Sequence, residues 1–166
     1  QREYINFLLE QSQEPIAPDA NSTLRVSYGK VEGMHPRDGV EYSYYTTADG
    51  ILEKEATGNE DYALREEVLS SLEKRDFGPW GRQDTLPVAF LASNHTTGGN
   101  SGSPVLNAHG ELIGINFDRI WEGVMSDIYF NPALSRNVSV DIRYVLYVID
   151  RLGNDRRLLD EMRISY

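Results

Sequence analysis

The segment that most constrains the fold is the glycine-rich run Thr97-Gly98-Gly99-Asn100-Ser101-Gly102-Ser103-Pro104-Val105. It places Ser101 between small residues, just ahead of a short apolar strand. A serine in this setting can stand exposed on a tight turn, where the backbone N–H groups of Gly99 and Ser101 point at one spot and hold a developing oxyanion. Glycine at 99 allows a positive φ at low steric cost. The run therefore indicates a nucleophile loop, with Ser101 as the nucleophile.

Two other glycine-rich motifs fit this run less well. A phosphate-binding loop ends in Lys-Ser or Lys-Thr and opens a helix, whereas here Pro104 and a strand follow. The Gly-x-Ser-x-Gly motif requires glycine at 103, where this chain has serine. Ser103 itself adjoins a proline at the start of a strand, so we interpret it as structural.

Composition excludes several classes of function. A chain of 166 residues with a net charge of −10 is long enough for one domain with a core, and its charge argues against nucleic acid as a partner. No run reaches the ~20 apolar residues of a membrane-spanning helix, so we expect no membrane insertion. The chain has no cysteine, and its three histidines lack metal-ligand spacing. We expect no metal and no organic cofactor.

The pattern along the chain predicts a mostly β protein with helices. Residues 1–14 are expected to be the tail of an upstream helical region, 15–22 a linker, and 23–166 a barrel domain. Expected strands start at Thr23 and cover 41–47, 87–93, 104–106, 111–118, 127–130 and 138–140, and Ala48-Asp49-Gly50 is expected to be a turn. One inserted helix is expected over 59–75, with closing helices over 142–152 and 156–164. Short strands joined by Gly- and Pro-rich turns favour a barrel.

The order of elements after Ser101 resembles the C-terminal barrel of chymotrypsin-like serine peptidases. A short strand, the turn Asn107-Ala108-His109-Gly110 and a second strand follow in sequence. In those peptidases the second strand forms a wall of the pocket for P1, the substrate residue before the scissile bond. The residues near its end here are Phe117, Asp118 and Arg119, so we expect them to bind substrate.

The charges of this strand end suggest which substrate it selects. An arginine is costly to bury unless an anion meets it, and its planar fork binds a carboxylate bidentately. Arg119 in a P1 pocket therefore favours Asp or Glu at P1. Asp118 offers the opposite charge, and a free substrate α-amino group is a natural partner for it. That pairing would make the enzyme an exopeptidase. The alternative is that Arg119 and Asp118 pair with each other or lie on a solvated edge.

Several segments together resemble one known family, the bacterial dipeptidyl peptidases 7 and 11, over nearly the whole chain. They are Thr-Thr-Gly-Gly-Asn-Ser-Gly-Ser-Pro-Val at 96–105, Gly-Ile-Asn-Phe-Asp-Arg-Ile-Trp-Glu at 114–122, Tyr-Gly-Lys-Val at 28–31 and Pro-Arg-Asp-Gly-Val at 36–40. Members have a chymotrypsin-like double barrel with a large inserted helical domain, and they remove dipeptides from free N-termini. Arginine at the position of Arg119 marks the branch that prefers acidic P1 residues.

The resemblance implies roles for individual residues. Ser101 corresponds to the nucleophile, Gly99 and Ser101 to the oxyanion donors, Arg119 to the P1 selector, and Asp118 to an anchor of the substrate amine. The family's catalytic His and Asp lie in the N-terminal part, which is missing here. The chain is then the C-terminal half of such an enzyme, expected to be inactive alone. His35, His95 and His109 are expected to be surface or loop residues and not the base.

Two other functions remain open at this point. A trypsin-like endopeptidase with an acidic P1 preference would accept a blocked N-terminus, and a non-catalytic module that binds acidic peptides would not need Ser101. The resemblance further implies a periplasmic or cell-surface location. Expected partners are a peptide with a free N-terminus, the missing N-terminal half of the same chain and, in the full-length protein, a second copy in a homodimer.

Overall fold

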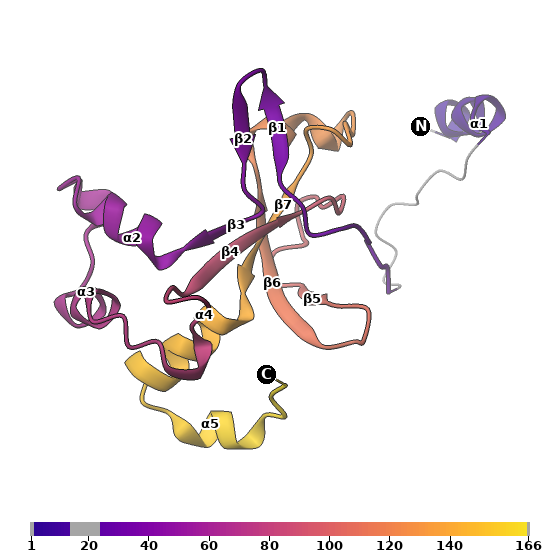
Figure 1. Ribbon diagram of the computed structural model, residues 1–166. Coiled ribbons are helices and arrows are strands. Elements are labelled where there is room, and N and C mark those ends of the chain that lie inside the picture. The colour runs from indigo at the N-terminus through magenta and orange to yellow at the C-terminus, as the bar shows by residue number, and fades with distance from the viewer. Residues whose placement is uncertain (1, 14–23, 166) are drawn as a thin grey trace.

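The chain is organised around a five-stranded antiparallel sheet with strand order β3-β4-β7-β6-β5, accompanied by the two-stranded hairpin β1-β2 (Figure 1). The structure, a computed structural model, describes residues 2–13 and 24–165. The strands are β1 (Met34–Arg37), β2 (Val40–Tyr42), β3 (Tyr45–Thr47), β4 (Pro87–Ala92), β5 (Pro104–Leu106), β6 (Leu112–Arg119) and β7 (Asn137–Asp141).

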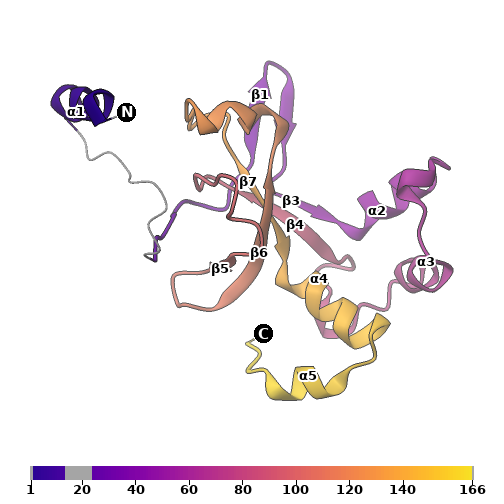
Figure 2. The same cartoon turned by 180° about the vertical axis from the view of Figure 1, so that it is seen from behind.

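Most of the helices gather around one end of this sheet, where β3 runs into α2 (Figures 1 and 2). The α-helices are α1 (Arg2–Gln11), α2 (Ala48–Glu55), α3 (Glu66–Glu73), α4 (Ile142–Tyr147) and α5 (Arg156–Glu161). Short 3₁₀ segments are η1 (Glu60–Tyr62), η2 (Gly78–Trp80) and η3 (Trp121–Asp127), and α4 continues as the π-helical turn η4 (Val148–Leu152). None of the helices in the described ranges is both long and apolar enough to cross a bilayer.

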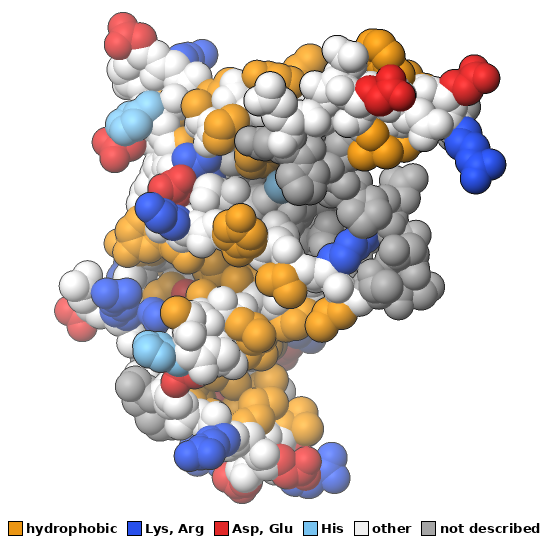
Figure 3. Space-filling view, turned by 90° about the vertical axis from the view of Figure 1, so that its right-hand side faces the viewer, with side chains coloured by type: hydrophobic (Ala, Val, Ile, Leu, Met, Phe, Trp, Pro, Cys, Tyr) orange, Lys and Arg blue, Asp and Glu red, His pale blue; other side chains and the backbone are white. Residues whose placement is uncertain are grey.

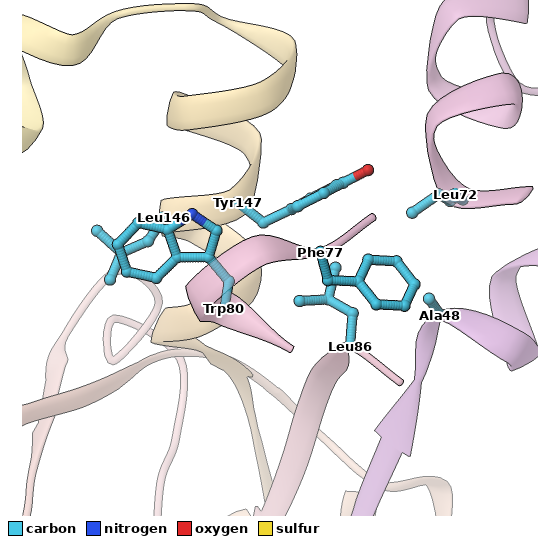
Figure 4. Packing of buried hydrophobic residues seen from close by; sticks show 7 residues of the cluster. All are labelled: Ala48, Leu72, Phe77, Trp80, Leu86, Leu146 and Tyr147. Atoms are coloured by element: carbon cyan, nitrogen blue, oxygen red, sulfur yellow. The ribbon is translucent and has the colours of Figure 1, made fainter. Parts of the chain in front are cut away.

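The hydrophobic core lies between these helices and the sheet. It consists of Ala48, Leu72, Phe77, Trp80, Leu86, Leu146 and Tyr147 (Figure 4). The rings of Phe77 and Tyr147 meet edge to face, with 5.8 Å between their centroids. The indole Nε1 of Trp80 donates to the buried carboxylate of Asp150 at 3.0 Å, so the polar atom that enters this core is satisfied.

Most of the expected elements are present. The four strands β4, β5, β6 and β7 and the helices α1, α4 and α5 form where the apolar periodicity indicated them, and Asp38-Gly39 turns the β1-β2 hairpin. The fold is therefore a helix-and-sheet structure with antiparallel strands. Barrel closure stays a prediction, because the strand order described above runs from β3 to β5 without pairing its two edges. The expected linker at 15–22 lies outside the described residues.

The strand expected from Thr23 is wrong. Residues 24–30 carry no strand. Val31 makes an isolated bridge with Ala92, and Ser27 and Lys30 bond to residues 93–95 through one backbone bond and several side-chain bonds, which do not form a ladder. The alternating side chains Leu24, Val26 and Tyr28 are 94, 79 and 89% exposed. Alternation marks two faces of an extended segment, but a strand also needs a neighbour for its N–H and C=O groups.

The expectations for the helical insertion and for 127–130 need correction. Ala48-Asp49-Gly50 opens helix α2 instead of forming a turn, because the Ala48 N–H bonds to Leu86 O and Asp49 pairs with Arg75. The single helix expected over 59–75 is η1 followed by the shorter α3, so the insertion holds two α-helices.

Residues 127–130 are likewise not a strand. They follow the helical segment η3, where the N–H groups of Ile128 and Tyr129 both bond to Met125 O at 2.9 Å.

Candidate active site

The loop between β4 and β5 has the backbone that its glycines predict. Gly99 has φ +99° and Gly102 has φ +83°, both in the region that disfavours side chains. A Cβ at either position would meet nothing within 4 Å. Glycine is therefore required here by backbone conformation and not by lack of space.

Ser101 stands exposed at the tip of this loop, beside two open donors. The backbone N–H groups of Gly99 and Ser101 bond to no acceptor among residues 2–13 and 24–165. The Ser101 hydroxyl donates to the carbonyl of Phe117 at 3.3 Å, a long bond that an incoming group can displace. An exposed hydroxyl next to two uncommitted N–H groups can present a nucleophile and stabilise an oxyanion at one place.

A β-bulge in β6 supplies the carbonyl that Ser101 contacts. Asn116 lies opposite Ser139 of β7, and Asp118 lies opposite Val138, so Phe117 is the extra residue in β6. A bulged residue drops out of the ladder and bends its strand. The bulge leaves the carbonyl of Phe117 available to Ser101 and sets the direction of the strand end that carries Asp118 and Arg119.

Backbone and amide hydrogen bonds fix the loop to β6. The Gly102 N–H donates to Asn116 O at 2.8 Å, and the Asn116 N–H donates to Ser103 O at 2.9 Å. The side chain of Asn100 accepts from the Thr97 N–H at 2.9 Å, and the Asn116 amide donates to Asn100 O at 3.1 Å. Asn100 is thus held through its side chain and through its carbonyl, and this fixes the turn just before Ser101.

A buried polar layer of β7 supports Asn116 from below. The Asn137 amide donates to Asn116 Oδ1 at 2.9 Å and to Ser139 Oγ at 3.3 Å. Asn116, Asn137 and Ser139 are 5, 2 and 0% exposed. Buried amides and hydroxyls that bond to one another restrict the strands to one register. The loop therefore rests on a directed network of hydrogen bonds.

Arg119 is engaged by Asp127 of η3. The guanidinium Nη1 and Nη2 donate to the two carboxylate oxygens of Asp127 at 2.8 and 2.5 Å, and Nη1 also donates to Ser126 Oγ at 2.9 Å. These bonds lower the pKa of the Asp127 carboxyl and raise the pKa of the Arg119 guanidinium above its ordinary value. The expected alternative, an ion pair between the side chains of Arg119 and Asp118, does not form.

Asp118 and Phe117 present exposed side chains next to this pair. Asp118 Oδ1 accepts the backbone N–H of Arg119 at 2.8 Å, which orients the carboxylate. The side chain of Phe117 is 49% exposed. The structure thus brings all of the expected site residues, Gly99, Ser101, Phe117, Asp118 and Arg119, to one end of β6.

None of the three histidines, all of which lie in the described ranges, forms a hydrogen bond with Ser101. His95 packs on the ring of Phe130, with 4.7 Å between centroids, and its Nε2 lies 3.0 Å from the carbonyl of Ser126. Because a carbonyl only accepts, Nε2 carries a proton in this contact. Within those same ranges, no three His, Cys, Asp or Glu side chains gather as a metal site requires.

Two residues of this site escaped the sequence reasoning. Asp127 reaches Arg119 only because η3 turns the chain back, and nothing in its spacing of eight residues indicates this contact. Asn116 lies on the buried face of β6, where an apolar residue is the usual choice. A lone amide between the apolar residues Ile115 and Phe117 is the signal that marks such a position for hydrogen bonding.

Large hydrophobic side chains surround the site at the surface. Trp121 and Ile128, on and just after η3, are 85 and 91% exposed. Figure 3 shows hydrophobic side chains spread over one side of the molecule and interspersed with charged ones.

Comparison with known proteins agrees with this architecture. The structure of DPP11 from Porphyromonas endodontalis in complex with the dipeptide Arg-Glu superposes with a TM-score of 0.92 at 44% identity, covering 99% of this chain and 24% of that one. The Asp/Glu-specific dipeptidyl-peptidase of Porphyromonas gingivalis is 53% identical over 99% of this chain and 23% of its own length. The dipeptidyl-peptidase 7 of Phocaeicola vulgatus is 48% identical over 97% of this chain and 23% of its own length.

The fold of this chain is thus shared with part of DPP11. The chain belongs to the peptidase S46 family, whose pattern matches residues 1–164. It spans about a quarter of the length of the relatives that it matches.

Proposed function

We propose that this chain is the nucleophile-bearing, C-terminal part of a serine exopeptidase that removes dipeptides with Asp or Glu at P1 from free N-termini. The observation that carries the proposal is the exposed Ser101 beside the open N–H groups of Gly99 and Ser101, at the strand end that holds Arg119. The names of the relatives, some Asp/Glu-specific and others dipeptidyl-peptidase 7, agree with a peptidase of this class.

The proposed chemistry divides between this chain and the rest of the protein. Ser101 Oγ attacks the carbonyl carbon after the second substrate residue, and its proton passes to a histidine outside this chain. The tetrahedral oxyanion then accepts from the N–H groups of Gly99 and Ser101. The acyl-enzyme forms as the leaving amine takes that proton, and water hydrolyses it. The ring of His95 is committed to Phe130 and Ser126, which supports an external base and an inactive isolated chain.

The specificity follows from the charges at the end of β6. Arg119 binds the P1 carboxylate, and Asp118 binds the free α-amino group, so that a dipeptide fits between them. Phe117 lines the pocket between these groups. The surrounding architecture is a chymotrypsin-like barrel of the intact enzyme, located in the periplasm or at the cell surface.

The test is hydrolysis of unblocked dipeptide–fluorophore substrates with Asp or Glu at P1 by the full-length protein. We expect turnover that Ser101→Ala abolishes and that N-acetylation of the substrate abolishes as well. Ser103→Ala is the matched control, because its hydroxyl makes no bond to a described residue and it lies in the same loop. Turnover of the acetylated substrate would indicate an endopeptidase, and unchanged peptide binding with no turnover would indicate a binding module.

A further inference from the structure

Arg119 uses only one edge of its guanidinium for Asp127. Nη1 and Nη2 each donate one hydrogen to the carboxylate, and the second hydrogen of Nη1 bonds to Ser126 Oγ. A guanidinium has five N–H donors in a planar fork. Three are used here, and two remain.

The two remaining donors form a second fork. They are the Nε–H and the second Nη2–H, which lie side by side on the same edge of the plane. Neither meets an acceptor among the residues that the structure describes. A pair of parallel N–H groups matches the two oxygens of one carboxylate.

We propose that Asp127 is a positioning residue for P1 recognition, and that Arg119 holds two carboxylates at once: Asp127 through Nη1 and Nη2, and the P1 side chain through Nε and Nη2. The inference rests on the proposed function and deepens it. Asp127 determines which edge of Arg119 faces the substrate. The P1 carboxylate joins the pair and does not displace Asp127.

Asp127 is well placed to do this because η3 is anchored to the nucleophile loop. Ser126 is 5% exposed, and its carbonyl accepts the Nε2 proton of His95, which lies six residues before Ser101. The ring of Phe130 packs on the His95 ring and also helps to hold it in place. The guanidinium plane of Arg119 therefore has a fixed orientation relative to Ser101. A substrate carbonyl needs this orientation to reach the Ser101 hydroxyl.

The charge balance of the Arg119–Asp127 pair explains how the site distinguishes a P1 carboxylate from a P1 amide. Arg119 and Asp127 together carry no net charge, so the pair attracts an anion less strongly than a lone arginine would. Selection then depends on directed hydrogen bonds. A carboxylate accepts both remaining N–H groups, whereas the isosteric amide of Asn or Gln accepts one and opposes the other with its own NH₂ group.

The contrasting possibility is that Asp127 imitates a P1 side chain and occupies its place until substrate arrives. The two cases differ in sign. If Asp127 positions Arg119, neutralising Asp127 weakens the acidic preference, because the fork is no longer oriented. If Asp127 competes with substrate, the same change strengthens it.

The experiment compares Asp127→Asn with the wild type in the full-length protein, using unblocked substrates paired as Asp/Asn and Glu/Gln at P1. We expect KM for acidic P1 to rise about tenfold with kcat little changed, and kinetics for amide P1 to stay near wild type. The ratio of kcat/KM for acid over amide then falls about tenfold. Asp127→Glu restores two carboxylate oxygens and should recover part of this ratio.

Glu122→Gln is the matched control, because Glu122 is an acid of the same segment that bonds to the Tyr42 hydroxyl at 3.0 Å and not to Arg119. A rise in the acid-over-amide ratio for Asp127→Asn, or an equal fall for both substrate types, overturns the proposal. If that variant does not fold, Ser126→Ala, which removes only one Nη1 bond, replaces it with a smaller expected fall; an unchanged ratio then overturns the proposal. Absence of any acidic preference in the wild type would instead refute the proposed function.

Discussion

The two ends of the central sheet are built from opposite kinds of buried side chain. At the helix-covered end the buried residues are mostly apolar, with Leu72, Leu86 and Tyr147 fully buried. At the Ser101 end they are mostly polar, with Asn137, Ser139 and Arg136 2, 0 and 7% exposed. Apolar burial contributes free energy without fixing a direction, whereas hydrogen bonds fix direction at little net gain.

The difference shows how the site stays open and yet rigid. A nucleophile loop covered by an apolar layer would be inaccessible to substrate. Here the loop is held from one side by Asn116 and Asn137, and its other side faces outward. The polar end therefore contributes geometry, and the helix-covered end contributes most of the stability. Changes at the two ends should separate these two properties.

The largest loss of stability is expected from Tyr147→Ala at the apolar end. Tyr147 is 0% exposed and packs on Phe77, and truncation of a buried aromatic ring costs about 3–5 kcal/mol. Urea unfolding measures this loss. Tyr147→Phe, which removes only the hydroxyl contact with Ser71, should cost about 1 kcal/mol. Equal losses for both variants would contradict the dominance of apolar packing.

A smaller loss is expected from Arg136→Ala at the polar end. Arg136 is 7% exposed, and its guanidinium donates to the carbonyls of Gly33, Pro132 and Ser135. Leaving such acceptors unpaired costs about 2–3 kcal/mol in total. Urea unfolding again measures it. The exposed Arg65, which pairs with Glu67, is the control, and Arg65→Ala should change stability by less than about 0.5 kcal/mol.

Asn116→Ala should separate geometry from stability. It removes the bonds to Asn100 O and Asn137, so we expect a stability loss of about 1–2 kcal/mol. In the full-length protein we also expect kcat/KM to fall about 10–100-fold, because the loop no longer holds Ser101 in place. Peptidase kinetics and urea unfolding are measured on the same samples.

The control for Asn116→Ala lies in the turn between β5 and β6. Asn107 bonds to the N–H groups of His109 and Glu111 and lies away from Ser101. Asn107→Ala should cost similar stability and leave kcat/KM near wild type. A matching loss of activity in both variants would show that the amide network has no special role at the site.

The apolar end was largely predictable from the sequence, whereas the polar end was predictable only in its motif. Helix α4 was expected because its apolar residues repeat at helical spacing, and that spacing needs no knowledge of distant residues. Ser101 and Gly99 were expected because the loop chemistry is local. Helix α2 was missed because Asp49-Gly50 is a typical turn pair, and the contact with Arg75 that supports the helix comes from 26 residues away.

Asp127 was missed for the same reason. The sequence shows a carboxylate eight residues after Arg119, but only the path of η3 brings the two together. Residues 24–30 show the converse, because local alternation is present but their bonds to residues 93–95 run mostly through side chains and form no backbone ladder. Local patterns predict elements, and long-range pairing decides which of them form.

The smallest expected effects are on the pH dependence of stability, where two aspartates should act with opposite sign. Hydrogen bonds from Arg119 lower the pKa of Asp127, so its contribution is present above the unfolded pKa of about 3.9 and is lost as the pH falls through the folded pKa. Burial raises the pKa of Asp141, which caps α4, so its contribution is present below the unfolded pKa and is lost as the pH rises through the folded value.

Urea unfolding of Asp127→Asn and Asp141→Asn from pH 7 to pH 3 tests this pair. Asp127→Asn should be less stable than wild type at pH 7, because the ion pair with Arg119 is gone. Asp141→Asn should be more stable at pH 7, because asparagine caps a helix as well as aspartate does and carries no buried charge. Both differences should shrink as the pH falls, the Asp141 difference first, because its folded pKa is raised and that of Asp127 is lowered. If both variants are more stable than the wild type at pH 7, or both less stable, then the ion pair of Asp127 and the burial of Asp141 do not have the opposite effects inferred from their contacts.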